Sequence, residues 1–452
     1  MNKKMSWQPD WSRRRFLSRS AAAAAAAVAA PMIVPARVLG LEGGVAPSNR
    51  ITIGFIGTGR QAFYANIPAL LNENDAQCVA VCDVDSWRMG QARKQIEEFY
   101  AAKQEGTYRG CATFRDWREL IARKDIDAVM ISTPDHWHVI QAIAAARAGK
   151  SISCEKPLTR SIAEGRKLCD VVKETKVVFR TDSEYRSRKF FFNAIQAVRN
   201  GRIGKLQRVI TATPRDPTLE PQPAMPVPEE LDYDMWLGPA PEAPYTEQRV
   251  HTRHNTGKRP GWICIRDYAD GMIANWGAHL NDMALWAMNL EHTGPVEVRG
   301  SGKFPPRENL WNVVIDFEVT YRFANGMDLI CKTDPKPFVR YEGTDGWIQV
   351  NDSGSVEASD KALIRWTPGP DDLHLTYKRS EKRDFLDAVK AGTQPLYDVE
   401  AGHRNTSLCH LALAAMETGR PLKWDPTAEK VIGDEAAEKL LAPKPYRDAW
   451  KL

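Results

Sequence analysis

A short apolar strand that runs directly into a glycine-rich turn is the feature that most restricts how this chain can fold. Residues 51–56 are apolar and largely β-branched, and helical sequence follows the turn through about Leu71. The turn itself consists of Gly57, Thr58, Gly59, Arg60, Gln61 and Ala62. A G-x-G-x-x-A pattern between a strand and a helix is typical of dinucleotide-binding domains, because the glycines allow a tight turn and close approach to the pyrophosphate. We therefore expect residues 57–61 to contact a dinucleotide.

An acidic residue ends the next predicted strand, Gln77–Cys82. Asp83 follows Gly57 by 26 residues. A carboxylate at this position binds the adenosine ribose hydroxyls and disfavours a 2′-phosphate, so it favours NAD over NADP. Arg88, five residues further on, could partly reverse that preference.

Strands and helices continue to alternate after Asp83. Predicted strands at 127–131, 151–154 and 176–179 are separated by helical sequence, which indicates a doubly wound parallel sheet with ligands at the carboxyl ends of its strands. Polar residues follow directly after two of these strands. The ones we expect near the cofactor are Thr133, Pro134, His136, Glu155 and Lys156.

The second half of the chain has a different pattern. A predicted helix at 186–199 and a strand at 206–213 precede a stretch, 214–228, that holds six prolines and is expected to be an irregular loop. Four further strands are expected at 296–301, 313–322, 327–332 and 346–350, with Asn325 and Gly326 as a two-residue hairpin turn. We predict an N-terminal Rossmann domain at 46–181, then an α+β domain with a large, mostly antiparallel open sheet at 182–452.

The first 45 residues are predicted to be an export signal and linker. Ser12-Arg13-Arg14-Arg15-Phe16-Leu17-Ser18 is followed by an alanine-rich run at 21–30, with a plausible cut near Ala29. A basic segment, an apolar segment and small residues, in that order, describe a secretory signal, and the paired arginines indicate the twin-arginine export machinery. The alternatives are a disordered basic tail or an uncleaved anchor. We expect a periplasmic protein.

Charge and cysteine usage exclude other classes. Residues 1–30 carry a net charge of +5, which equals that of the whole chain, so the remainder is neutral and no nucleic-acid partner is expected. None of the eight cysteines forms a Cys-x-x-Cys pair, and they are expected to be core residues. His136 with His138, and His279 with Asp282, lack further ligands, so no metal site is predicted.

Several motifs in this order resemble the Gfo/Idh/MocA family, the glucose–fructose oxidoreductases and inositol dehydrogenases. They are Gly57-Thr58-Gly59-Arg60, Thr133-Pro134-Asp135-His136, Glu155-Lys156-Pro157-Leu158, and residues 277–282 (Gly-Ala-His-Leu-Asn-Asp). Residues 233–241 are similar to an exported subgroup. The resemblance covers nearly the whole mature chain and implies a substrate cleft beside the nicotinamide and an open sheet that serves homo-oligomerisation, as a dimer or tetramer.

The resemblance also implies catalytic roles. Lys156 belongs to the Glu-Lys-Pro motif, whose lysine reaches the substrate hydroxyl and the cofactor. His279 corresponds to the family's proton acceptor, which suits a side chain with a pKa near neutrality. Asn275 stands where the family's Asp-x-x-x-His pattern has an aspartate, so it can orient a hydroxyl but cannot take a proton.

Candidate substrate contacts lie near these residues. They are Tyr185, Arg186, Trp276 and Asp282, and Asp282 could instead orient His279. Trp236, Trp262 and Trp286 also fall in the predicted cleft segments. Aromatic faces stack on sugar rings, although core packing is the alternative for each tryptophan.

Three functions fit these residues. The first is an NAD(P)-dependent oxidoreductase for a sugar, polyol or glycoside. The second is an NAD-dependent glycoside hydrolase that oxidises its substrate transiently and returns the hydride. The third is a non-catalytic sugar-binding protein, which retention of Lys156 and His279 disfavours. Because a periplasm supplies little free NAD, we expect the cofactor to be tightly bound.

Overall fold

The computed structural model describes residues 49–104, 110–447 and 450–451. The predicted export signal, with Ser12–Ser18 and the cut near Ala29, lies outside these residues. Residues Ile51–Leu452 form one unit, and every observation below concerns that unit. Within its described part, no helix has both the length and the apolar character needed to cross a bilayer.

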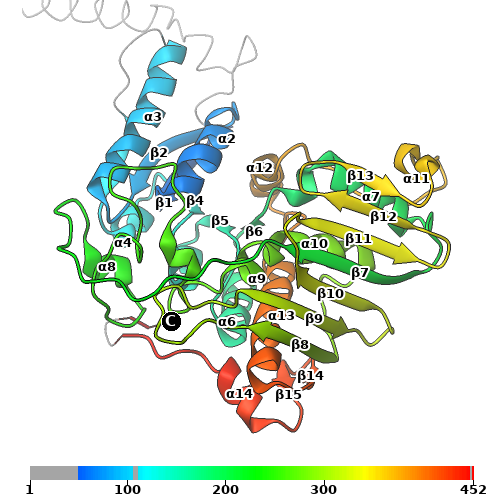
Figure 1. Ribbon diagram of the computed structural model, residues 1–452. Helices are drawn as coiled ribbons and strands as arrows, with labels where there is room; N and C mark the ends of the chain where they lie inside the picture. Colours follow the sequence, from blue (N-terminus) through cyan, green and yellow to red (C-terminus); the bar gives the residue numbers. More distant parts are fainter. Residues whose placement is uncertain (1–48, 105–109, 448–449, 452) are drawn as a thin grey trace, which may run out of the picture. The chain divides into compact units, whose positions relative to one another are not determined.

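The first half of the chain forms a six-stranded parallel sheet (Figure 1). Its strands lie in the order β3-β2-β1-β4-β5-β6. Strands β2 and β3 are added on one side of β1 and strands β4 to β6 on the other, so the order of strands reverses between β1 and β4. The strands are β1 (Ile51–Ile56), β2 (Ala76–Cys82), β3 (Ala112–Phe114), β4 (Ala128–Ile131), β5 (Ser151–Glu155) and β6 (Phe179–Asp182). A reversal of this kind is where doubly wound sheets bind ligands, at the carboxyl ends of the strands. The predicted Rossmann architecture is therefore confirmed.

Helices cover both faces of this sheet. One face packs against α4 (Trp117–Ala122), α5 (His138–Arg147) and α6 (Ile162–Thr175). The opposite face packs against the π-helix Ala62–Asn66, α2 (Ile67–Leu71), α3 (Ser86–Gln104) and, from far along the chain, α12 (Glu381–Ala391). Strands buried on both faces need near-continuous apolar sequence, and residues 51–56 have it.

The second sheet has nine strands in the order β13-β12-β11-β7-β10-β9-β8-β14-β15. Neighbouring strands pair antiparallel except β7 with β10, which confirms the predicted mostly antiparallel sheet. Its strands are β7 (Leu206–Thr213), β8 (Glu297–Lys303), β9 (Asp316–Arg322), β10 (Asp328–Thr333), β11 (Phe338–Gly343), β12 (Trp347–Asn351), β13 (Val356–Ala358), β14 (Leu422–Asp425) and β15 (Lys430–Val431).

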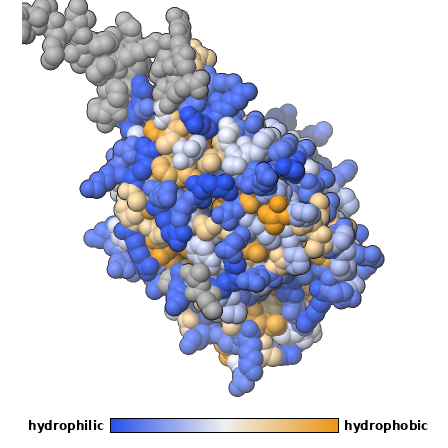
Figure 2. All heavy atoms as spheres, turned by 90° about the vertical axis from the view of Figure 1, so that its left-hand side faces the viewer, coloured by the Kyte–Doolittle hydropathy of each residue, from blue (hydrophilic) through white to orange (hydrophobic). Residues whose placement is uncertain are grey.

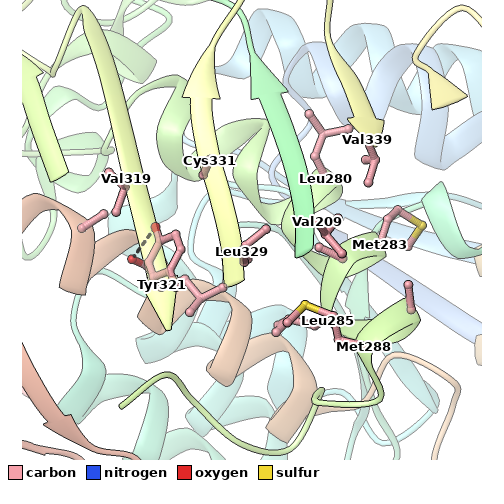
Figure 3. Close-up of a cluster of buried hydrophobic side chains, with 14 of the residues drawn as sticks. Val209, Leu280, Met283, Leu285, Met288, Val319, Tyr321, Leu329, Cys331 and Val339 are labelled. Carbon is pink, nitrogen blue, oxygen red and sulfur yellow. Dashed lines mark hydrogen bonds between the residues drawn. The ribbon is translucent and has the colours of Figure 1, made fainter. Parts of the chain in front are cut away.

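One face of this sheet is buried under helices. These helices are α7 (Lys189–Arg199), α10 (Gly277–Met288), α13 (Val399–Thr418) and α14 (Glu435–Leu441). Figure 3 shows Leu280 and Met283 of α10 against Val209, Leu329 and other inward side chains of the strands. Alternate residues of these strands are buried, so only one face of the sheet joins the core.

Two short helices lie near residue 235 and residue 273, in the segments that border the site. They are α8 (Tyr233–Leu237) and α9 (Met272–Asn275), and α9 leads into α10 at Gly277. The face shown in Figure 2 is mostly hydrophilic, with scattered smaller apolar areas. Isolated apolar areas of that kind are ordinary for protein surfaces.

A network of buried charges joins α12 to the end of β6. Arg180 Nε lies 3.1 Å from Asp384 Oδ2, and Arg180 Nη1 lies 3.2 Å from Asp182 Oδ1. Lys382 Nζ donates to Asp182 Oδ2. The four side chains are all nearly inaccessible to solvent. Removing one partner of a buried pair leaves an uncompensated charge, so each member depends on the others.

Three local predictions need correction. The strand expected at 176–179 begins at Phe179, because Lys176 ends α6 in a left-handed conformation with φ 57°. The strand expected from residue 313 begins at Asp316. The turn at Asn325-Gly326 has three residues, since Phe323 N–H donates to the Met327 carbonyl at 3.0 Å.

Gly165 of α6 provides a test of helix packing against α13. A Cβ at Gly165 would lie 2.2 Å from His403 Nδ1, and His403 is itself held by Glu429 at 2.9 Å. We expect Gly165→Ala to lower the free energy of unfolding by about 1–3 kcal/mol through overpacking. Gly90→Ala in α3, where a Cβ meets nothing within 4 Å, should raise it by about 0.5–1 kcal/mol. Denaturant unfolding of both variants measures the difference, and equal stability would contradict the assigned packing.

Candidate active site

A cavity of about 590 Å³ lies at the carboxyl ends of the parallel strands. Its wall includes the glycine turn, the ends of β4 and β5, and segments of the second half around Lys258 and His279. This volume is in the range of small-molecule and cofactor sites. The predicted site residues that line it are Gly57, Gly59, Arg60, Gln61, Asp83, Thr133, Pro134, Glu155, Lys156, Tyr185, Asn275, Trp276 and His279.

The glycine turn fits a dinucleotide. Gly57 has φ 86°, and a Cβ there would lie 2.7 Å from the Ser132 backbone, so this position requires glycine. At Gly59 a Cβ would meet nothing within 4 Å, which leaves open space above the backbone for a ligand. Thr58 does not line the cavity, but its N–H and hydroxyl donate to Asp83 Oδ2 at 2.7 and 2.8 Å. Asp83 is therefore held at the turn, where ribose hydroxyls are bound in this fold.

Residues 251–260 of the second half cross the cofactor side of the first sheet, and we call this segment the strap. His251 Nε2 lies 2.9 Å from Asp85 Oδ2, and Arg60 Nε donates to the Gly257 carbonyl at 2.9 Å. Arg88 donates to the Asn255 carbonyl at 2.7 Å. The strap thus contacts the glycine turn and the residues that follow β2.

Lys156 and Asn275 meet at the far end of the cavity. Lys156 follows β5, and its Nζ donates to the backbone carbonyl of Asn275 at 3.3 Å. The side-chain oxygen of Asn275 accepts from Arg259 Nη2 at 3.4 Å. Asn275 therefore contacts one cation through its backbone carbonyl and another through its side-chain amide.

His279 is positioned by residues that follow β6. Its Nδ1 lies 2.7 Å from Ser183 Oγ, and its ring stacks on Tyr185 with centroids 4.3 Å apart. With Nδ1 bonded, Nε2 is the ring nitrogen available to a ligand. When Nδ1–H donates to Ser183, Nε2 carries the free lone pair and can accept a proton.

Burial and nearby charges set the protonation states of His279 and Glu184. Burial lowers the pKa of His279 to about 3, with Lys156 and Arg188 acting in the same direction and Glu184 opposing them. Burial raises the pKa of Glu184, but His279, Arg188 and Lys156 outweigh it and lower the pKa to about 2. Glu184 Oε2 lies 3.8 Å from His279 Nδ1 and Glu184 Oε1 lies 2.9 Å from Arg188 Nη2. Near neutral pH, His279 is a neutral base and Glu184 is a carboxylate.

Three carboxyl groups on the wall have raised pKa values, and for Asp83 the causes are burial and the nearby charge of Asp85. Burial raises the pKa of Asp135 to about 8, against the opposing charges of Arg160 and Lys156. Burial and Asp182 raise the pKa of Glu155 to about 7, and Glu155 Oε1 accepts from Asn66 Nδ2 at 2.9 Å. Raised carboxyl pKa values in a cavity are typical of functional sites.

Besides Thr58, three predicted site residues lie outside the cavity. His136 is buried behind the wall, where its Nε2 lies 3.2 Å from the Trp236 carbonyl. Arg186 and Asp282 form a buried bidentate ion pair, with N–O distances of 2.9 and 2.7 Å. Neither Arg186 nor Asp282 lines the cavity, and Asp282 bonds Arg186, whereas His279 Nδ1 bonds Ser183. His138 lines the cavity. Its Nδ1 lies 2.9 Å from the Pro157 carbonyl, and its Nε2 lies 2.9 Å from the Thr133 carbonyl.

The tryptophans divide between wall and core. Trp236, Trp262 and Trp276 line the cavity, whereas Trp286 packs in the core of the second sheet. Several polar wall residues were absent from the sequence predictions. They are Glu184, Arg188, Lys258, Arg259 and Asp352. Arg188 bonds Asp352 at 2.6 Å across 164 residues, a contact without a local sequence signal.

The fold and the cavity define a dinucleotide-binding protein in which a lysine and a neutral histidine face one ligand space. Residues 51–183 match the family model described as "Oxidoreductase family, NAD-binding Rossmann fold", and residues 218–452 match "Oxidoreductase family, C-terminal alpha/beta domain". The chain belongs to the Gfo/Idh/MocA oxidoreductase family.

Individual relatives carry different activities in their names. A "Glycosyl hydrolase family 109 protein" of Stenotrophomonas maltophilia is 26% identical over 366 residues, which is 76% of this chain and 75% of the relative. The inositol 2-dehydrogenase of Rhizobium meliloti is 33% identical over 173 residues, 38% of this chain and 47% of that one. The chain therefore spans less than half of the dehydrogenase.

Solved structures share the fold. The aldose–aldose oxidoreductase of Caulobacter crescentus superposes with a TM-score of 0.59 at 17% identity, covering 83% of this chain and 99% of the other. A levoglucosan dehydrogenase complex with NADH gives a TM-score of 0.57 at 19% identity, with 83% and 99% covered. Similarity at this level of identity shows the arrangement of the two sheets.

The protonation of His279 can be measured directly. Because its pKa is lowered to about 3, we expect the imidazole to stay neutral from about pH 5 to about pH 8. Nitrogen-15 NMR of the histidine rings, with His279→Gln to assign the signal, reports this. A titration midpoint near 6 would show that His279 is protonated more easily than its surroundings imply.

Proposed function

We propose that the protein binds NAD and transfers a hydride between its nicotinamide and a hydroxyl-bearing carbon of a sugar, polyol or glycoside. The observation that carries the proposal is the placement of Lys156 and His279 on one cavity wall with the glycine turn, although they come from different halves of the chain. Relatives named as inositol and levoglucosan dehydrogenases support this substrate class.

His279 and Lys156 have different parts in the proposed reaction. When bound, the nicotinamide supplies the hydride acceptor. His279 Nε2 accepts the hydroxyl proton, and Ser183 and Tyr185 hold the ring in place. Lys156 stabilises the oxygen as it loses that proton, and its hydrogen bond to the Asn275 carbonyl fixes the position of its ammonium group.

The choice of NAD over NADP rests on Asp83. Its carboxylate is fixed by Thr58, and a 2′-phosphate there would meet like charge. Arg88 does not offset this, since it is already bonded to strap carbonyls and lies 3.7 Å from Asp85. The strap also supports tight binding, because its residues add a further wall to the cavity beside the glycine turn.

The second candidate is a glycoside hydrolase that uses the same cofactor without net oxidation. The similarity to the family 109 hydrolase covers three quarters of both chains, more than the match to the dehydrogenases. The same two residues would serve it, since a proton must leave and later return to the sugar.

One experiment separates these functions. The chain from Gly44 onward is purified without added cofactor and given free sugars and glycosides, while nicotinamide fluorescence and released sugar are followed together. We expect NAD to copurify, added NAD to bind more tightly than NADP, and the cofactor to become stably reduced. Sugar release with unchanged cofactor would instead establish the hydrolase.

Variants show whether the proposed residues act. Lys156→Met and His279→Gln should each lower the rate by about 10²–10⁴-fold, as expected for loss of acid–base groups. Lys303→Met, at an exposed position on β8, is the matched control and should keep full activity. A sugar-binding protein would keep its affinity in all three variants and show no turnover.

We further propose that the protein is exported to the periplasm through the twin-arginine machinery. The support is the order of basic, apolar and small residues around Arg13 and Arg14. Replacing both arginines by lysine should leave a reporter fused after residue 50 in the cytoplasm, while the unaltered segment delivers it outside. Equal export of both fusions would refute the assignment.

A further inference from the structure

The end of the cavity at Lys156 and Asn275 holds three cations, and carboxyl groups on the same wall act on Lys156 through space without a direct ion pair. Lys156 and Arg259 both contact Asn275, through its carbonyl at 3.3 Å and its side-chain oxygen at 3.4 Å. Lys258 lines the same wall. In the described part of the chain, none of these three cations forms an ion pair with a carboxylate. Arg259 faces the side-chain amide of Asn275, which carries no charge, whereas Lys156 bonds the backbone carbonyl of the same residue.

Two arginines with little solvent access are each paired with a carboxylate, whereas Arg259 is exposed on the cavity wall. Arg160 pairs with Asp270, and Arg186 pairs with Asp282 at 2.7 Å. Burial lowers the pKa of both side chains, but these carboxylates outweigh burial and raise it. Even Arg188, on the cavity wall, has Glu184 and Asp352 as partners.

Arg259 has no carboxylate within ion-pair distance among the described residues, and its guanidinium is open to solvent. Desolvation beside the cavity wall lowers the pKa of its guanidinium, and the positive charge of Arg60 lowers it further. Cys264 and Asp216 raise this pKa, but by less. Its side-chain contacts are Met272 Sδ at 3.5 Å, a weak acceptor, and the Asn275 oxygen at 3.4 Å, which is long for a charged donor. A guanidinium with unused donors facing a cavity is suited to bidentate binding of a carboxylate.

Two anions could use this site, the pyrophosphate of the cofactor and a carboxylate of the substrate. The glycine turn has its own cation, Arg60, which the strap holds through Gly257. Arg259 instead contacts Met272 and Asn275 of α9, and Asn275 contacts Lys156. This position favours the substrate.

We infer that the substrate is an acidic sugar, a uronic or aldonic acid or a glycoside of one, whose carboxylate is bound by Arg259 beside Lys156 and Asn275. The inference rests on the proposed function and specifies its substrate class. Arg259 is then a specificity residue, and the uncharged Asn275 preserves its positive charge. A carboxylate at position 275 would occupy the guanidinium and compete with the substrate.

The test compares acid and neutral sugars of the same stereochemistry, glucuronate with glucose, galacturonate with galactose and gluconate with sorbitol. Binding to the NADH-loaded protein is measured by calorimetry and by quenching of tryptophan fluorescence, so no turnover is needed. We expect the best acid to bind at least about tenfold tighter than its neutral partner, as for a charged hydrogen bond. Equal or weaker binding of every acid would overturn the inference.

Three variants assign the effect. Arg259→Met and Asn275→Asp should each reduce the acid preference by about tenfold or more, while NAD affinity stays within about twofold. Arg299→Met removes an exposed arginine of β8 that lies outside the cavity, and should change neither value. If Arg259→Met weakens NAD binding and leaves the acid preference intact, Arg259 binds the cofactor and the inference is wrong.

The same measurements separate this inference from the proposed function. If neutral sugars bind and reduce the cofactor as well as acids do, the oxidoreductase assignment holds and the acidic substrate is excluded. If NAD binds but no sugar of either kind binds, both are excluded.

Discussion

The buried charge network at the end of β6 is the interaction on which the rest of the site depends. Arg180 and Asp182 belong to the parallel sheet, whereas Lys382 and Asp384 belong to a helix formed some 200 residues later in sequence. Loss of one partner of such a network lowers the free energy of unfolding by about 3–5 kcal/mol, because the remaining charge is buried without water or an opposite charge. Ser183, the residue after Asp182, is the one that bonds His279. The network therefore sets the backbone that orients the proposed base.

Much of the fold could be predicted because its signals are local. Residues 51–56 are buried on both sides, so their apolar run coincides with β1. β11 was not predicted, since Pro335 and Pro337 precede it and its outward side chains include Arg340 and Glu342. The shift at Lys176 arose from a helix cap at a non-glycine residue, which composition does not reveal.

Site residues placed by local sequence could be predicted, whereas those placed by long-range contacts could not. Gly57, Gly59 and Asp83 could be predicted because one turn and one strand end place them, within 26 residues of sequence. Arg188 and Asp352 meet only because β12 is brought beside α7, and no local pattern encodes that contact. Arg186 follows the last strand of the parallel sheet and Asp282 lies three residues after His279, positions that predict substrate contacts. Each is instead the other's partner, which is how the core accommodates two charges with little exposure.

The position of α12 also has a consequence for synthesis. Phe385, Leu386 and Ala388 of this helix pack with Ile53 and Phe55, residues made more than 300 positions earlier. A ribosome releases the first sheet long before the segment that covers this part of its face. During that interval apolar side chains of β1 remain uncovered, and exposed surface of this kind promotes aggregation or chaperone binding. The first sheet therefore completes its core only when nearly nine tenths of the chain has been made.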